Sequence, residues 1–156
     1  MALKIGIQTY SVRNHMAKDP VETLRQVAKA GYHYVEFANH HAIVDDGIGF
    51  DQPAEKIKAT LDEIGVKTAG CHVYPGIATG VVTGSETNDD YEEDYTKVNF
   101  DKIFKYQETL GNRNLSMAMV LFSSRDDVLR KCEQFNAAGK RCHDNGFVRH
   151  YHNHYE

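Results

Sequence analysis

Hydrophobic residues recur at helical spacing in four segments of the chain, and each segment has recognisable start and stop signals. The first begins at Asp19-Pro20, a capping residue followed by proline at the first helical position, and ends at Gly31. Three more such segments follow, at residues 53–65, 99–111 and 124–146. In the last segment we expect four apolar side chains to face the core: Val128, Leu129, Cys132 and Phe135. The pattern therefore predicts four amphipathic helices.

Strand-like runs precede each predicted helix and follow the last one, at residues 4–12, 33–38, 67–74, 114–122 and 147–156. Strands that alternate with helices favour parallel pairing, with the helices packed outside the sheet. An open doubly wound sheet and part of a closed barrel both satisfy this order. The barrel is favoured because no G-x-G-x-x-G follows the first strand, and because polar residues gather where the strands end.

We therefore predict an α/β fold, a parallel (β/α) barrel of the TIM type. Residues 1–156 hold about four βα units and a fifth strand, whereas a complete barrel has eight units and roughly 250 residues. The chain is accordingly expected to be a truncated barrel. Between the third strand and the third helix, residues 76–98 form a long acidic stretch that is predicted to be a loop. It is either a lid over the active face or a solvated, mobile loop.

Composition narrows the class of protein and its partners. The chain has a formal net charge of −4 and no block of Lys or Arg, which disfavours nucleic acid as a partner. No apolar run reaches the roughly 18 residues of a membrane helix, and the N-terminus has no secretory signal. The three cysteines show no C-x-x-C spacing, which favours free thiols in a reducing compartment. We expect a cytoplasmic protein without a membrane partner.

Polar residues at the predicted strand ends are the candidates for a site, because the carboxyl ends of barrel strands form the active face. Gln8 and Tyr10 alternate inward on the first strand, where they either contact substrate or pack in the barrel with a satisfied polar tip. Glu36 interrupts an apolar strand, so it is either a site residue or one partner of a salt bridge. His72 closes the apolar third strand and is a further candidate.

The fifth strand carries the densest cluster of candidate ligands. Alternation places His152, His154 and Glu156 on one face. Two imidazoles and a carboxylate on one face resemble the ligand set of a borderline divalent ion. They could equally supply one ligand and acid–base groups, or hydrogen-bond in the barrel mouth without a metal.

Four of these stretches, at residues 5–11, 31–37, 65–72 and 151–154, resemble the xylose-isomerase-like barrel superfamily. Within it the chain is similar to the N-terminal part of the sugar phosphate isomerase/epimerase family. The resemblance implies a divalent ion (Mn, Mg, Co or Zn) and proton transfer through an enediolate. It suggests metal ligation by His152 and Glu156, although relatives place that glutamate one position later. It also suggests catalysis by Glu36 and His154.

The same resemblance implies a small sugar or sugar-phosphate substrate, contacted by Gln8, Tyr10 and His72. Most of the family's metal ligands lie on strands six to eight, so this chain is expected to be inactive alone. Two alternatives are a non-catalytic half-barrel and, against the negative charge, a metal-dependent nuclease resembling endonuclease IV. An incomplete sheet has two open edges, so we expect a homo-oligomer.

Overall fold

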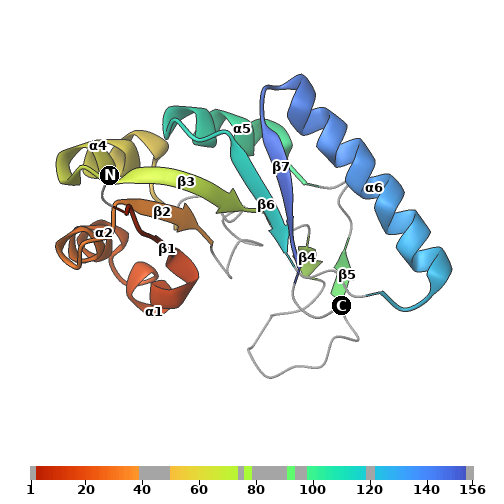
Figure 1. Cartoon of the computed structure of the whole chain (residues 1–156), viewed down its shortest axis with the longest axis horizontal. Coiled ribbons are helices and arrows are strands. Elements are labelled where there is room, and N and C mark those ends of the chain that lie inside the picture. The colour runs from red at the N-terminus through yellow and green to blue at the C-terminus, as the bar shows by residue number, and fades with distance from the viewer. Residues whose placement is uncertain are drawn as a thin grey trace.

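The computed structural model contains one five-stranded parallel sheet, and it describes residues 3–38, 50–73, 76–78, 91–93, 98–118 and 122–153. The strands follow one another in the sheet in chain order (Figure 1): β1 (Gly6–Gln8), β2 (Tyr34–Phe37), β3 (Lys67–His72), β6 (Asn114–Ala118) and β7 (Val148–His152). Every neighbouring pair is parallel. The predicted α/β order of five sequential parallel strands is confirmed.

Four helices connect the strands at the predicted places: α2 (Pro20–Lys29), α4 (Ala54–Ile64), α5 (Phe100–Thr109) and α6 (Arg125–Asp144). Asp19, Asn99 and Ser124 cap three of them, since each side chain accepts a hydrogen bond from the backbone N–H three residues later. Gly65 ends α4 in the left-handed conformation, with φ of 69°. Local capping chemistry therefore sets these helix boundaries.

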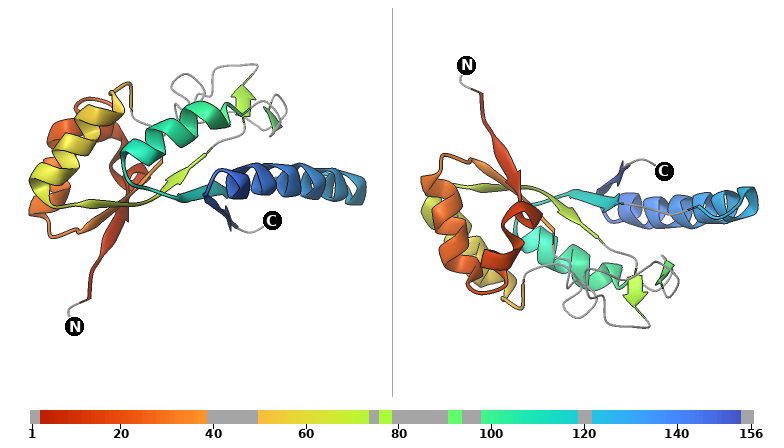
Figure 2. Two further views of the ribbon diagram at one scale, coloured as in Figure 1. Left: turned by 90° about the horizontal axis from the view of Figure 1, so that it is seen from above. Right: turned by 90° about the horizontal axis from the view of Figure 1, so that it is seen from below.

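Helices α2, α4 and α5 and the core lie on one face of the sheet, whereas α6 lies along the edge strand β7. Figure 2 shows α2, α4 and α5 on one side, with the N-terminal segment projecting on the opposite side. Five strand side chains on the helix-facing side are fully buried: Val35, Phe37, Cys71, Leu115 and Met117. Burial of each of these side chains stabilises the fold by roughly 1.5–3 kcal/mol. The opposite face, called the inner face below, carries the polar strand-end residues.

The first strand is shorter than predicted. It ends at Gln8, and the chain continues as a 3₁₀ helix, η1 (Thr9–Val12), and a short helix, α1 (Arg13–Met16). The predicted strand over 4–12 is therefore wrong beyond Gln8. Thr9 bonds Ala38 through its side chain, and the backbone there turns out of the sheet into η1.

Helix α6 buries only part of the predicted apolar set, in which Phe135 packs against the core. Its buried residues are Lys131, Ala138 and Cys142, whereas Leu129 is 54% exposed and Cys132 is exposed. The prediction that Leu129 and Cys132 face the core is wrong, because α6 packs along β7, the last strand of the sheet. Burial raises the pKa of the Cys142 thiol.

Residues 76–98, predicted as a loop, contain two short strands. β4 (Gly76–Ala78) and β5 (Tyr91–Glu93) pair antiparallel. Residues 79–90 and 94–97 of this stretch lie outside the described residues, so the lid interpretation stays a prediction.

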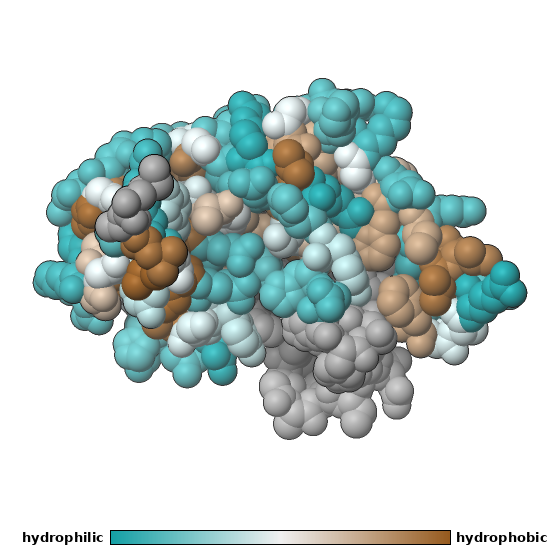
Figure 3. Space-filling view, viewed as in Figure 1, coloured by the Kyte–Doolittle hydropathy of each residue, from teal (hydrophilic) through white to brown (hydrophobic). Residues whose placement is uncertain are grey.

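The described part of the face seen in Figure 3 is largely hydrophilic, with separate hydrophobic patches on the left beside β1 and on the right beside α6. Among the described residues, the exposed large apolar side chains are Leu3, Ile5, Phe122, Leu129, Val148 and Tyr151. Within the described ranges, no helix combines the length and the apolar character that a membrane crossing requires.

Candidate functional site

Polar side chains of all five strands meet on the inner face, near the carboxyl ends. Gln8 of β1 pairs in register with Glu36 of β2, and His72 of β3 pairs with Ser116 of β6. His152 of β7 lies with its ring against that of His72. Because all the strands are parallel, their carboxyl ends lie at the same edge, which is where barrel enzymes hold their sites.

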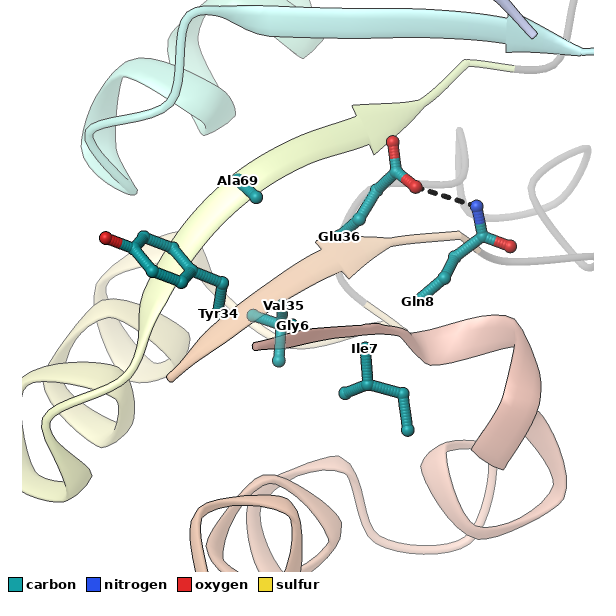
Figure 4. A pocket seen from close by; sticks show the side chains of 7 residues that line it. All are labelled: Gly6, Ile7, Gln8, Tyr34, Val35, Glu36 and Ala69. Atoms are coloured by element: carbon teal, nitrogen blue, oxygen red, sulfur yellow. Dashed lines mark hydrogen bonds between the residues drawn. The ribbon is translucent and has the colours of Figure 1, made fainter. Parts of the chain in front are cut away.

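The Glu36 carboxylate is the centre of this cluster. Gln8 Nε2 donates to its Oε2 at 2.7 Å, and the His72 Nε2 lies 3.5 Å from the same oxygen. The other oxygen, Oε1, accepts a longer bond of 3.4 Å from the Ser116 hydroxyl. The side chain is 28% exposed, so it is reachable from the inner face. Figure 4 shows the Gln8 and Glu36 side chains reaching toward each other at the ends of their strands.

Gly70 on β3 lies directly against this carboxylate. It lies opposite Glu36 in the β2–β3 pair, and a Cβ there would stand 3.1 Å from Glu36 Oε1. The missing side chain therefore leaves the space in which the carboxylate lies across β3. Sequence reasoning did not identify Gly70 or Ser116. An isolated glycine in a strand does signal a close approach, but it does not say to what.

His72 lies behind the pair and is almost fully covered. Its ring is 3% exposed, and its Nε2 lies 3.0 Å from Gln8 Nε2. The His72 and His152 rings meet edge to face, with centroids 4.9 Å apart. Gln8, Glu36, His72 and His152, which the sequence placed on four different strands, therefore form one connected cluster.

The remaining sequence candidates are placed differently. Tyr10 lies in η1 instead of on a strand, and its ring stacks under the Arg13 guanidinium at 4.2 Å. The expectation that Tyr10 alternates inward with Gln8 is therefore wrong, because the strand ends before it. His154 and Glu156 lie outside the described residues.

An open pocket of about 320 Å³ begins at the Glu36 carboxylate and runs along the inner face (Figure 4). Its lining residues come from three strands: Gly6, Ile7, Gln8, Tyr34, Val35, Glu36 and Ala69. Tyr34 closes the end away from Glu36 and Gln8. A carboxylate and an amide at one end of such a space are suited to hydroxyl groups of a small polyol.

The described residues do not by themselves form a metal site. Over the ranges that the structure covers, no three His, Cys, Asp or Glu side chains are grouped so as to hold an ion. The Glu36 Oε2 is already engaged by Gln8. Of the residues on the fifth strand expected to bind an ion, His152 lies within the described residues, whereas His154 and Glu156 lie outside them.

Comparison with known proteins places the fold among isomerase-like barrels. A sugar phosphate isomerase/epimerase from Parabacteroides distasonis superposes with a TM-score of 0.71 and 26% identity, over 98% of this chain and 55% of the other. A family 2 AP endonuclease from Brucella melitensis gives 0.57 and 20%, over 84% and 48%. A zinc-bound IolI protein gives 0.58 and 10%, over 97% and 51%.

The chain thus spans about half the length of these structures. No protein-family model and no curated protein matches the chain. The resemblance to part of a sugar phosphate isomerase/epimerase barrel, and the partial barrel fold itself, are confirmed.

Proposed function

We propose that this chain forms part of a sugar phosphate isomerase/epimerase in which Glu36 transfers the proton. The observation that carries the proposal is the Glu36 carboxylate, fixed by Gln8 at the head of an open pocket on the inner face. The similarity to the isomerase/epimerase over 98% of the chain supports the same reaction class.

The geometry suggests how the two oxygens of Glu36 divide their tasks. Gln8 holds Oε2, so Oε1 is the oxygen that takes a proton from the carbon beside a substrate carbonyl. The electron pair of the broken C–H bond then forms an enediolate. Return of the proton to the neighbouring carbon, while the hydroxyl proton there passes to the former carbonyl oxygen, isomerises the sugar. Protonation of the original carbon from the opposite face, by an acid other than Glu36, epimerises it. Gln8 and the covered His72 keep the carboxylate oriented during both steps.

The enediolate oxygen carries negative charge, and none of the seven residues lining the pocket is cationic. We therefore propose use of a divalent ion, supported by the zinc atom in the IolI structure and by the imidazole of His152. Because the described residues form no complete ligand set, we assign no step of the reaction to the ion.

Calorimetric titration with Zn²⁺ tests the ion. Replacing His152 and His154 together by Ala should abolish binding, while replacing His15 and His143, which are exposed on α1 and α6, should leave it unchanged. Equal binding by the parent and the His152/His154 double variant would remove the fifth strand from the proposed metal site.

Binding of an enediolate mimic tests Glu36 without requiring turnover. Phosphoglycolohydroxamate should bind the parent chain, and Glu36→Gln should weaken its affinity by about tenfold, or about 1.4 kcal/mol. Glu63→Gln is the matched control, because Glu63 is an exposed carboxylate on α4 that pairs with Arg25. Equal weakening by both variants, or by neither, would contradict a specific role for Glu36.

The substrate and assembly follow from the same proposal. We propose a small sugar or sugar phosphate as substrate, a cytoplasmic location and a homo-oligomer. Since the chain spans only about half of the similar structures, we also propose that these 156 residues alone turn over little substrate.

A metal-dependent nuclease is the second candidate, because the AP endonuclease shares the fold. The net charge of −4 argues against it, since a duplex-binding surface gains affinity from Lys and Arg. Fluorescence anisotropy with a labelled abasic duplex should show no binding at 150 mM salt. Saturable binding would favour the nuclease.

A further inference from the structure

Thr9 connects the two strands that carry Gln8 and Glu36, yet its hydroxyl touches neither side chain. Thr9 is fully buried, and its Oγ1 donates to the Ala38 carbonyl oxygen at 3.1 Å. Thr9 Oγ1 also accepts a hydrogen bond from the Ala38 N–H at 2.8 Å. We propose that Thr9 is a positioning residue that holds Gln8 opposite Glu36. This inference rests on the role proposed for Glu36.

The Thr9 hydroxyl supplies hydrogen bonds to β2 where the backbone pairing of β1 with β2 has ended. Backbone pairing of β1 with β2 covers only the register pairs from Gly6–Tyr34 to Gln8–Glu36. At Thr9 the backbone turns into η1, so its own groups no longer run along β2. Buried N–H and C=O groups require partners, and one threonine hydroxyl here serves both groups of Ala38.

The two hydrogen bonds between Thr9 and Ala38, called the Thr9 clamp below, lie next to the Gln8–Glu36 pair. Thr9 follows Gln8 directly, and Ala38 comes two residues after Glu36. The Thr9 clamp therefore fixes how β1 and β2 are aligned along each other at the end where Gln8 Nε2 donates its 2.7 Å bond to Glu36 Oε2. A pairing of three residues frays easily at its ends, and a bond beyond the last pair opposes that fraying.

Two substitutions separate the hydroxyl from the shape of the side chain. Thr9→Val keeps the volume and removes the hydroxyl, and Thr9→Ser keeps the hydroxyl. The parent chain and both variants are compared by ¹⁵N NMR, which follows amide exchange at Ala38 and the side-chain NH₂ signals of Gln8. Thr23→Val is the matched control, because Thr23 is a buried threonine in α2 whose hydroxyl bonds the Asp19 carbonyl.

In Thr9→Val we expect Ala38 exchange to rise about tenfold and the Gln8 NH₂ signals to move, while Thr9→Ser stays within about twofold of the parent. Unchanged Gln8 signals in Thr9→Val, with Ala38 exposed, would overturn the positioning role. If Thr9→Val does not fold, Thr9→Ser decides alone: loss of Ala38 protection or displaced Gln8 signals there would overturn the proposal. Hydroxamate binding is not the readout, so failure here leaves the proposed function of Glu36 to its own test.

Discussion

The side-chain amide of Gln8 donates a 2.7 Å hydrogen bond to Oε2 of Glu36 across the parallel pair of β1 and β2. The two residues lie opposite each other in register, 28 positions apart in the chain. A half-covered carboxylate needs such a donor, because it has lost part of its water shell. The bond thus links the stability of the sheet to the orientation of the group proposed to move the proton.

Replacing Gln8 by Met removes the amide while keeping the length of the side chain. We expect the free energy of unfolding to fall by about 1–3 kcal/mol, the usual range for a lost hydrogen bond to a charged group. Urea denaturation at pH 7 measures it. Gln26→Met is the control, because the Gln26 amide makes only a 3.4 Å exposed bond to Glu22, and its change should stay within about 0.5 kcal/mol. Equal losses of unfolding free energy in both variants would show that the Gln8–Glu36 bond stabilises the fold no more than the exposed Gln26 bond does.

A methyl group at position 70 should displace the Glu36 carboxylate. Its Cβ would lie 3.1 Å from Oε1, so we expect Gly70→Ala to weaken phosphoglycolohydroxamate binding by about tenfold. The matched control is Gly139→Ala on α6, where the nearest atoms of Arg149 stand at 3.9 Å. There the added methyl should raise the free energy of unfolding by up to about 1 kcal/mol through helix propensity, without changing binding. Unaltered affinity in Gly70→Ala would mean that the carboxylate moves aside without consequence.

The start of α6 should make stability depend on pH in the acid range. The backbone N–H of Ser123, then Lys131 and Arg130, hold the pKa of Asp127 well below its usual range. A lowered folded pKa means that the carboxylate stabilises the fold above its unfolded value of about 3.9, and that this contribution is lost as pH falls further.

Unfolding free energies from pH 6 down to pH 3 measure this contribution. Asp127→Asn should be less stable than the parent at pH 6, and the difference should shrink toward pH 3. Asp126→Asn, beside it in the same first turn, is the control and should follow the pH profile of the parent. A constant difference between Asp127→Asn and the parent over this range would contradict the assignment.

The helices and the strand order were predictable because their signals are local. Asp19, Asn99 and Ser124 cap their helices by bonding backbone groups three residues away, and such contacts are readable from sequence spacing. The end of β1 was not predictable, since it depends on the bond from Thr9 to Ala38, which is 29 positions away. Leu129 was misplaced for a similar reason, because the buried side of α6 depends on where the sheet ends.

The site was predictable in part. Gln8, Glu36, His72 and His152 stand out as polar residues at strand ends, and parallel pairing brings them to one edge. Gly70 and Ser116 carry no such signal, because their contribution is a space and a weak bond that exist only once β2, β3 and β6 are adjacent. Composition shows which residues are unusual, and packing shows which neighbours they require.

Open edges of the sheet should cause copies of the chain to associate. β1 and β7 are its edge strands, and apolar side chains are exposed at both: Leu3 and Ile5 just before β1, and Val148 and Tyr151 on β7. Edge strands present unpaired backbone groups that template pairing with another chain. We expect two or more copies to associate at micromolar concentration, and light scattering between 1 and 100 µM measures their mass.

A charge on the edge strand tests whether the sheet is the interface. Val148→Lys should shift the mass toward the monomer, because a lysine at the edge opposes pairing and carries like charge in both copies. Leu129→Lys is the control, since Leu129 is 54% exposed, as is Val148, but lies on α6. If Leu129→Lys disperses the assembly and Val148→Lys does not, the copies meet through α6. A parent chain that is monomeric throughout the range would refute association altogether, because its edges and apolar residues would then be stable in water.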